Sequence, residues 1–298
     1  MSHSSPNTDR PGIGIAWMLA TMFWFVALDA VAKFLMQDYP VAQVIWGRFF
    51  FHILFVMVVM GRSLPKLIPS QALGVQLKRS FYMFVTNALF FIGISSLPLT
   101  TASAIMFMGP LIVTVLAIPL LSETVGMRRW LGVLFGFIGA MVVIRPGGSE
   151  FQLSMVIVLI AAVSHSLYQI YTRQLGARDA PMTSLFYTGV FGAIVMSLYM
   201  PLEWKSVETT DWLLFMLLGG CGGVGHLCMI RAFRNAPASV VAPFSYTSLI
   251  WATLFGLVLF NELPDGWTLV GAAIIVASGL YVFNREQKQK QLASEETY

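Results

Sequence analysis

Long apolar runs, separated by short polar breaks, make up almost the whole chain. Ten such runs cover residues 12–36, 41–61, 78–97, 101–122, 128–145, 152–173, 182–201, 211–234, 238–260 and 266–284. Each is close to the roughly 20 apolar residues that a helix needs to cross a bilayer, and too continuous for a barrel strand. The breaks carry proline, glycine or charge. The pattern predicts an all-α membrane protein with ten transmembrane helices.

Composition agrees with this pattern and narrows the function classes. Of the 298 residues, 57% are hydrophobic and 11% are charged, and the mean hydropathy is +0.75. Soluble domains carry about 25% charged residues, so this chain has too little charge to cover a soluble surface. The first apolar run is too long for a cleavable signal peptide, so we interpret it as the first span.

The breaks are too short for a soluble catalytic domain, and they hold no zinc-protease or phosphate-loop motif. We therefore expect no enzyme, no cofactor and no metal site. The two cysteines, Cys221 and Cys228, lie seven residues apart in one apolar run and are expected to be free.

The basic residues predict an orientation. The net charge is +4, and with the N-terminus inside, fourteen of the eighteen Lys and Arg residues fall on the cytoplasmic side and three outside. This bias follows the rule that cytoplasmic loops are enriched in positive charge. Polar tails at 1–11 and 286–298 would both be cytoplasmic. Basic residues used in this way leave no groove for a nucleic acid.

The second half of the chain repeats the first. A shift of 139 residues places Pro98 on Pro237, Glu123 on Glu262 and Gly132 on Gly271 without a gap. Each half contains five spans, an odd number, so the halves must insert in opposite orientations. Inverted repeats of this kind are typical of secondary transporters, whose sites lie near the midplane between the repeats.

Two stretches resemble the EamA module of the drug/metabolite transporter superfamily. These are 98–146, with Gly109-Pro110 within a helix and Glu123 before the next span, and 237–285. The resemblance implies two inverted five-helix repeats, 12–146 and 152–285, around a central cavity. It also implies secondary transport by alternating access in the bacterial cytoplasmic (inner) membrane.

Within this superfamily, the second half is most similar to bacterial proteins linked to uptake of S-adenosylmethionine, riboflavin or related metabolites, while other relatives export amino acids. One departure is that Gly109-Pro110 becomes Ser248-Leu249 in the second half, with a proline earlier, at Pro243. We therefore expect the fourth and ninth spans to bend differently.

Charged side chains within spans are the first candidates for a site, because burying charge in hydrocarbon is costly. Asp29 and Arg48 lie at similar depths in the first two spans, and Lys33 follows Asp29 by one helical turn. They could form a structural ion pair between the helices. Alternatively, they form a charge cluster that meets the substrate or a proton.

Neutral polar groups near mid-span form the second set. Asn87 and His226 are related by the 139-residue shift, and His165 lies mid-span in the sixth helix. Each could be a buried group satisfied by a nearby carbonyl or hydroxyl. As functional groups, His165, His226 and Asp29 would be able to carry a proton, and Asn87 and His226 would flank the repeat axis.

Aromatic side chains near mid-span form the third set. Trp24, Tyr168, Tyr246 and Trp251 are too deep for the interfacial belt and are the best candidates for cavity walls that stack on a planar or cationic ligand. The glycines at 220–225 and the pair Gly132 and Gly136 indicate close helix packing, the latter against the fourth helix or another protomer. Glu123 and Glu262 are interpreted as structural residues that could cap the next helix.

These groups predict a secondary active transporter for a small amphoteric organic metabolite, such as an amino acid, an adenosyl-amine or a flavin-like molecule. Proton coupling or exchange would drive it. The alternative is a lipid-handling, flippase-type or channel-like membrane protein with the same fold. The expected partners are a small-molecule substrate and the lipid bilayer, and the protein would be a monomer or a homodimer.

Overall fold

The computed structural model describes residues 10–121, 126–148, 151–176 and 178–295, and all regular structure within these ranges is helical. The first half contains α1 (Pro11–Leu35), α2 (Val41–Met60), η1 (Gly61–Leu67), α3 (Leu73–Ile94), α4 (Leu99–Met106), α5 (Gly109–Leu121) and α6 (Met127–Ile144). The second half contains α7 (Leu153–Leu175), α8 (Pro181–Tyr199), η2 (Met200–Leu202), α9 (Asp211–Asn235), α10 (Ala238–Val241), η3 (Ala242–Thr247), α11 (Ser248–Phe260) and α12 (Gly266–Glu295). The segments η1, η2 and η3 are 3₁₀ helices.

These elements correspond to the ten predicted spans. Eight helices in the described part of the chain are long and apolar enough to cross a membrane. The other two spans are α3, whose first turns carry Gln76, Lys78 and Arg79, and α6, whose apolar stretch is shorter, at Trp130–Ile144. Each of the two packs along its length against a membrane-spanning helix, α3 against α7 and α6 against α12. The prediction of a ten-helix membrane protein is confirmed.

The fourth and ninth spans are both interrupted, and at equivalent positions. The fourth breaks between α4 and α5, and its second part begins at Gly109. The ninth passes through η3, and α11 begins at Ser248, which is 139 residues after Gly109. The two breaks therefore share a position in the repeat and differ, as expected, in their form. Pro243 sits at the start of η3 and replaces an α-helical turn by a longer 3₁₀ segment.

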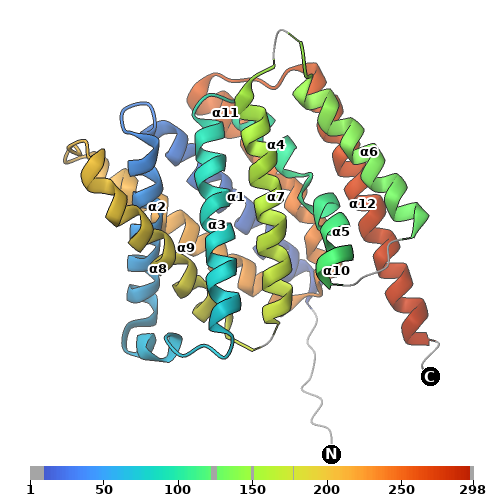
Figure 1. Ribbon diagram of the computed structural model, residues 1–298, viewed down its shortest axis with the longest axis horizontal. Helices are drawn as coiled ribbons and strands as arrows, with labels where there is room; N and C mark the ends of the chain where they lie inside the picture. Colours follow the sequence, from blue (N-terminus) through green and yellow to red (C-terminus); the bar gives the residue numbers. More distant parts are fainter. Residues whose placement is uncertain (1–9, 122–125, 149–150, 177, 296–298) are drawn as a thin grey trace, which may run out of the picture.

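The helices pair reciprocally between the halves. The first helix of each half packs against the third helix of the other, as α1 with α9 and α3 with α7, while α2 packs on α8 and α6 on α12. Figure 1 shows α2, α8 and α9 on one side of the bundle and α6 and α12 on the other. Helix α1 begins where α9 ends, since Arg10 N donates to the Asn235 carbonyl. The first helix of one half thus runs antiparallel to the third helix of the other half. An inverted duplication requires this arrangement.

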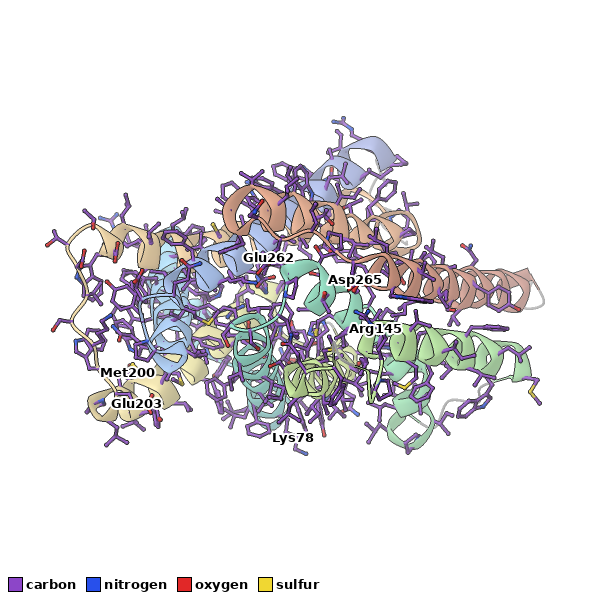
Figure 2. All side chains as sticks on the ribbon, turned by 90° about the horizontal axis from the view of Figure 1, so that it is seen from above. Lys78, Arg145, Met200, Glu203, Glu262 and Asp265 are labelled. Carbon is purple, nitrogen blue, oxygen red and sulfur yellow. The ribbon has the colours of Figure 1, made fainter. Side chains whose placement is uncertain are left out.

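The α6–α12 pair shows this symmetry at the level of single contacts. A Cβ on Gly132 would collide with Val282, and a Cβ on Gly271 would collide with Val143, the same contact shifted by 139 residues in both partners. Gly136 packs against Leu111 of α5 and Ser278 of α12, so the predicted packing face meets the fourth span and, mainly, α12. Figures 1 and 2 show the two helices running together away from the rest of the bundle.

The glycines of α9 hold that helix close to α1 and α2. A Cβ on Gly219 would meet the backbone of α2, one on Gly222 would meet Leu28 and His52, and one on Gly225 would meet Phe25. Small residues let helix backbones approach closely where apolar burial gives no driving force. The packing interpretation of this segment is confirmed, and both cysteines in it are free and buried.

We name the two ends of the bundle by the chain ends. Residue 10 and the end of α12 lie at one end, called here the terminal end, and the loops before α2, α4 and α12 lie at the other, called the distal end (Figure 1). Helix α12 continues to Glu295, well beyond the predicted end of the last span.

Candidate functional site

Asp29 of α1 and Arg48 of α2 face each other in the interior without forming a closed ion pair. They interact electrostatically, yet neither forms an ion pair within 4.0 Å in the described part of the chain. Arg48 is 6% exposed, and its buried Nε has no hydrogen-bond partner among the described residues. Asp29 accepts no hydrogen bond there either, and it keeps some accessible surface. The Arg48 guanidinium lies 4.8 Å from the centroid of the Phe49 ring. The geometry therefore leaves a cation and an anion next to each other without a hydrogen bond to either from the described residues.

Two histidines lie beside this charged pair. His52 follows Arg48 by one turn of α2, and its ring centroid lies 5.7 Å from that of His226 on α9. Both imidazoles are buried. Gly189 and Gly222 make room for His52, since a Cβ on either would approach its ring within 3.1 and 3.5 Å. His226 Nδ1 lies 2.9 Å from the Gly222 carbonyl.

Arg79 of α3 is a second buried cation. Its guanidinium donates to Thr172 Oγ1 (2.9 Å), the Ser184 carbonyl (3.0 Å), Thr188 Oγ1 (2.9 Å) and Tyr168 Oη (2.7 Å). All four acceptors are neutral, and no carboxylate pairs with Arg79 among the residues that the structure describes. From the sequence, Arg79 was counted among the basic residues on the cytoplasmic side, at the start of the predicted span 78–97, and its burial was not anticipated. The residue is 4% exposed and ties α3 to α7 and α8.

Tyr168 connects the two arginines. Its hydroxyl accepts a hydrogen bond from Arg79, and the Cζ atom of Arg79 lies 4.6 Å from the centroid of the Tyr168 ring. Tyr168 also interacts electrostatically with Arg48. Because its oxygen is occupied as an acceptor, its own proton is free to donate. His165 stacks on Tyr168 with ring centroids 5.5 Å apart, and the buried Nδ1 of His165 has no partner among the described residues.

The pair Asn87 and His226 keeps its symmetry in the structure. Asn87 Nδ2 donates to the Met83 carbonyl at 2.7 Å, and Met83 is the repeat equivalent of Gly222. Both side chains therefore bond to the carbonyl four residues earlier in their own helix. This contact with a nearby carbonyl is the structural role considered for both residues from the sequence. Their functional role beside the repeat axis stays a prediction.

The other three predicted aromatic residues contact further aromatic rings. Trp24 and Trp251 both pack edge-on against Phe23 of α1, at 5.4 and 5.1 Å between ring centroids. Tyr246 packs edge-on against Phe107 at the break of the fourth span. The contacts above link Asp29, Arg48, Tyr168, His165 and His226. For Trp24, Trp251 and Tyr246, the role as cavity walls stays a prediction.

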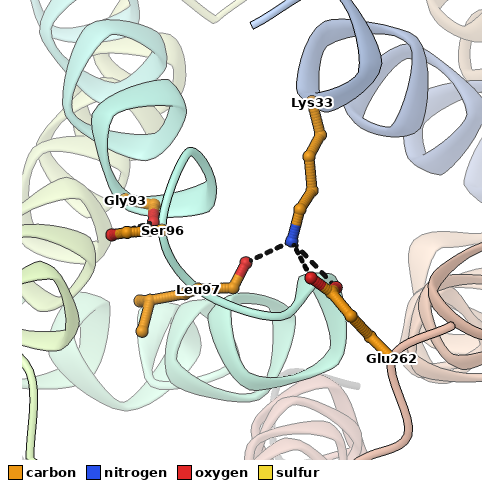
Figure 3. A network of polar contacts seen from close by, with 5 residues as sticks. All are labelled: Lys33, Gly93, Ser96, Leu97 and Glu262. Carbon is orange, nitrogen blue, oxygen red and sulfur yellow. Dashed lines mark hydrogen bonds and ion pairs between the residues drawn. The ribbon is translucent and has the colours of Figure 1, made fainter. Parts of the chain in front are cut away.

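At the distal end, Lys33 binds Glu262 rather than Asp29 (Figure 3). Its Nζ donates to both carboxylate oxygens, at 2.6 and 2.8 Å, and to the Leu97 carbonyl at 2.7 Å. The sequence interpretation of Glu262 as a structural residue included a possible cap on the following helix. That cap is Asp265, which accepts from the amides of Trp267 and Thr268. The repeat equivalent of Glu262, Glu123, lies outside the described residues.

Asp265 also pairs with Arg145 at 2.9 Å. Burial alone would raise the pKa of Asp265, but the hydrogen bonds from Thr268 and Trp267 and the charge of Arg145 together hold that pKa below its ordinary value of 3.8. Figure 2 shows Glu262, Asp265 and Arg145 gathered near one another at the distal end.

An open cavity of about 570 Å³ lies on the distal side of the Lys33–Glu262 pair. We call it the vestibule. Its polar lining includes Lys33, Gln37, Ser95, Asn261 and Glu262. A cation and an anion thus border this cavity at the distal end of the bundle.

At the terminal end, Asp179 joins the loop before α3 to the loop before α8. It accepts hydrogen bonds from Ser70 Oγ (2.5 Å), Gln71 N (2.9 Å) and Gln76 Nε2 (2.8 Å). Burial on its own would raise the pKa of Asp179, but these hydrogen bonds outweigh it and lower the pKa below 3.8.

The sequence interpretation missed His52 and did not anticipate the burial of Arg79. A signal existed for His52, because a histidine inside a span, four residues after Arg48, must share its helix face. No such signal existed for Arg79, since it follows Lys78 at the start of the predicted span, where basic residues are common. Within the described ranges, no three His, Cys, Asp or Glu side chains are close enough together to hold a metal ion.

Comparisons with known proteins agree with this architecture. The EamA-like transporter family matches the chain twice, over residues 12–145 and 152–284. An S-adenosylmethionine uptake transporter of Rickettsia bellii is 28% identical over 279 residues, covering 93% of this chain and 95% of its own. A riboflavin transporter of Vibrio cholerae is 26% identical, covering 95% and 96%. A pseudopaline exporter of Pseudomonas aeruginosa is 25% identical, covering 89% and 94%.

A solved crystal structure shares the fold. It is 19% identical, with a TM-score of 0.58, and the match covers 91% of this chain and 98% of the other. At this identity the likeness concerns the fold alone.

Proposed function

The chain belongs to the EamA-like transporter family, a family of multi-pass membrane transporters of small metabolites, and we propose that its substrate carries both an ammonium and a carboxylate group. Asp29 would receive the ammonium and Arg48 the carboxylate. Alternating access between the two inverted halves would carry the substrate across the cytoplasmic membrane of a bacterium, with the terminal end inside.

One observation carries this proposal. Arg48 and Asp29 lie next to each other in the interior, and among the described residues neither makes a hydrogen bond or a close ion pair. A charge buried without a partner costs several kcal/mol, so unpaired charges inside a membrane protein are retained for function. A zwitterion would supply the missing counter-charge to both at once.

Arg79 favours a carboxylate over a simple amine. The described interior contains two buried arginines, Arg48 and Arg79, and one aspartate, Asp29, so its formal charge is positive. The proton of Tyr168, whose oxygen is held by Arg79, can donate to the same carboxylate that Arg48 binds. An anionic group on the substrate would therefore be stabilised by three groups from three helices.

The names of the relatives fit this class in part. S-adenosylmethionine contains an α-ammonium and an α-carboxylate, whereas riboflavin contains neither. We propose that the substrate of this chain belongs to the amino-acid-containing group. Proton coupling would use Asp29, His165 and His226, the groups proposed from the sequence, together with His52, which contacts His226.

The test uses ligands that differ from one another by a single charged group, in addition to protein variants. Purified protein is titrated with S-adenosylmethionine, methionine, N-acetylmethionine, methioninamide and riboflavin, and binding is followed by thermal stabilisation and calorimetry. Removing one member of a buried charge pair costs about 2 kcal/mol or more, or at least about thirtyfold in affinity. We expect Asp29→Asn to erase the preference for methionine over N-acetylmethionine.

By the same reasoning, Arg48→Gln should erase the preference for methionine over methioninamide. Asp38→Asn, which changes an exposed aspartate in the loop after α1, is the matched control and should keep both preferences. Binding of riboflavin without binding of either zwitterion would overturn the proposed substrate class. Preferences that survive both site variants would remove Asp29 and Arg48 from the site.

A further inference from the structure

The Lys33–Glu262 pair links three segments that are distant in sequence. Lys33 belongs to α1, Leu97 to the loop between α3 and α4, and Glu262 to the loop between α11 and α12 (Figure 3). One ammonium group therefore joins α1 to the loops that precede the fourth and the last span at the distal end. Separating these segments requires its bonds to be broken.

The pair also lies between the vestibule and the charged centre. Lys33 and Glu262 both line the vestibule, and Asp29 precedes Lys33 by one turn on the same face of α1. The distance along the helix axis between these two residues is about 6 Å. Each level offers one cation and one anion, Lys33 with Glu262 and Arg48 with Asp29.

We propose that the vestibule is a second, outer binding site for a zwitterion, and that the Lys33–Glu262 pair is the barrier between it and Asp29–Arg48. A ligand with an ammonium and a carboxylate exchanges its charges for those of the pair. Its carboxylate binds Lys33 and its ammonium binds Glu262, so the barrier opens without leaving a charge unpaired. The choice of ligand class rests on the proposed function, while the barrier does not.

The ion pair is suited to reversible opening. The Lys33 side chain is 9% exposed and the Glu262 side chain 27%, so the carboxylate is the more open of the two groups toward the vestibule. A pair that is partly solvated binds less tightly than its Coulomb energy in a dry interior would suggest. The Arg145–Asp265 pair at the same end is more exposed, at 24% and 46%, and does not line the vestibule.

The barrier is tested without a ligand. Ala30 is 1% exposed and lies one turn below Lys33 on α1, so Ala30→Cys reports access of a water-soluble methanethiosulfonate to the interior. Labelling is measured in detergent, where both ends meet the reagent and the membrane orientation does not matter. Protein without Ala30→Cys corrects for Cys221 and Cys228.

We expect Lys33→Met and Glu262→Gln each to raise the labelling rate by about tenfold or more, because they shift the population toward open forms. The charge-reversed double variant Lys33→Glu with Glu262→Lys should return the rate to within about threefold of the starting value. Arg145→Gln, the matched control, should leave it unchanged, as should Lys33→Arg.

Unchanged rates in both single variants would overturn the barrier. So would an equal rise with Arg145→Gln, which would indicate general loosening, or a double variant that labels as fast as the single ones. Thermal unfolding confirms that each variant is folded. If Lys33→Met does not fold, Glu262→Gln, which preserves shape and one acceptor oxygen, decides the test.

The outer site is tested by protection. Gln37 is exposed and lines the vestibule, so Gln37→Cys reports occupancy of that cavity. We expect methionine at millimolar concentration to slow its labelling by about threefold or more, and N-acetylmethionine and methioninamide to protect less. Lys33→Met should abolish the protection.

Asp29→Asn with Arg48→Gln should keep this protection, which separates the two sites. If the protection is lost in the Asp29→Asn, Arg48→Gln variant and kept in Lys33→Met, the ligand binds at Asp29–Arg48 alone. That result would overturn the outer site. Absence of protection by every probe would overturn it as well. If Asp29 and Arg48 prove not to bind substrate, labelling of Ala30→Cys and of Gln37→Cys can still be interpreted, because neither measurement depends on these two residues.

Discussion

Replacing Gly219 by alanine tests whether the close approach of α9 to α2 positions His52 and Arg48. A Cβ on Gly219 would lie 2.5 Å from His52 N and from the Phe51 carbonyl carbon, and closer still to Phe51 Cβ. Non-bonded heavy atoms prefer about 3.5–4.0 Å, so the helices must separate by about 1 Å. The obstacle is backbone, so no side-chain rotation relieves it.

The expected cost follows from two opposing terms. Overpacking of this kind costs about 1–3 kcal/mol, and the gain in helix propensity from glycine to alanine is about 1 kcal/mol. Since the clash involves backbone, we expect a net destabilisation of about 1–2 kcal/mol. Gly220 is the matched control, because a Cβ added there would have no atom within 4 Å. Gly220→Ala should therefore stabilise α9 by about 0.5–1 kcal/mol.

The assay is thermal unfolding of both variants in one detergent, combined with binding of whichever probe the protein recognises. Gly219→Ala should unfold a few degrees lower than the unchanged protein and bind more weakly, because it moves His52 and with it the turn that holds Arg48. Gly220→Ala should unfold at an equal or higher temperature with unchanged binding. Equal stability of the two variants would refute the close helix contact.

Other parts of the structure support three more predictions. Because the pKa of Asp265 is lowered, its contribution to stability is complete above pH 3.8 and is lost as the pH falls through the lowered value. Asp265→Ala should therefore cost about 1 kcal/mol in thermal unfolding at pH 7, and little at a pH well below that value. Arg79→Lys should destabilise more than Arg79→Met, since lysine keeps the buried charge and loses the fork of hydrogen bonds; the reverse order in thermal unfolding would contradict this reasoning. In intact cells, an impermeant thiol reagent should label Thr209→Cys at the distal end and not Gln71→Cys at the terminal end, and the opposite result would reverse the predicted orientation.

The covalent order of apolar and polar residues determined the architecture. In a bilayer, every backbone amide must find its hydrogen bond within its own helix, so ten apolar runs of the right length leave few alternatives to ten helices. The 139-residue repeat then implied two halves of five spans in opposite orientation. The equivalent contacts of Gly132 with Val282 and of Gly271 with Val143 show that the repeat extends to single side-chain contacts.

Pairwise contacts between charged groups were decided by the tertiary structure. Lys33 is four residues from Asp29, a spacing that favours a contact within one helix, yet it binds Glu262, 229 residues away. Helix geometry fixes which face a side chain shares, but which helix lies opposite that face depends on the packing of the whole bundle. The same applies to Arg79, whose acceptors come from α7 and α8.

The candidate site was therefore predictable in composition and not in arrangement. Asp29, Arg48 and His226 stand out in the sequence because charge and imidazole are costly in apolar spans. Asp29 and Arg48 approach without closing, Tyr168 lies between two arginines, and Trp251 and Tyr246 pack on Phe23 and Phe107. All of these contacts depend on distances of a few ångströms between helices. Such distances are set by the summed packing of small and large side chains along each interface, which no local stretch of sequence contains.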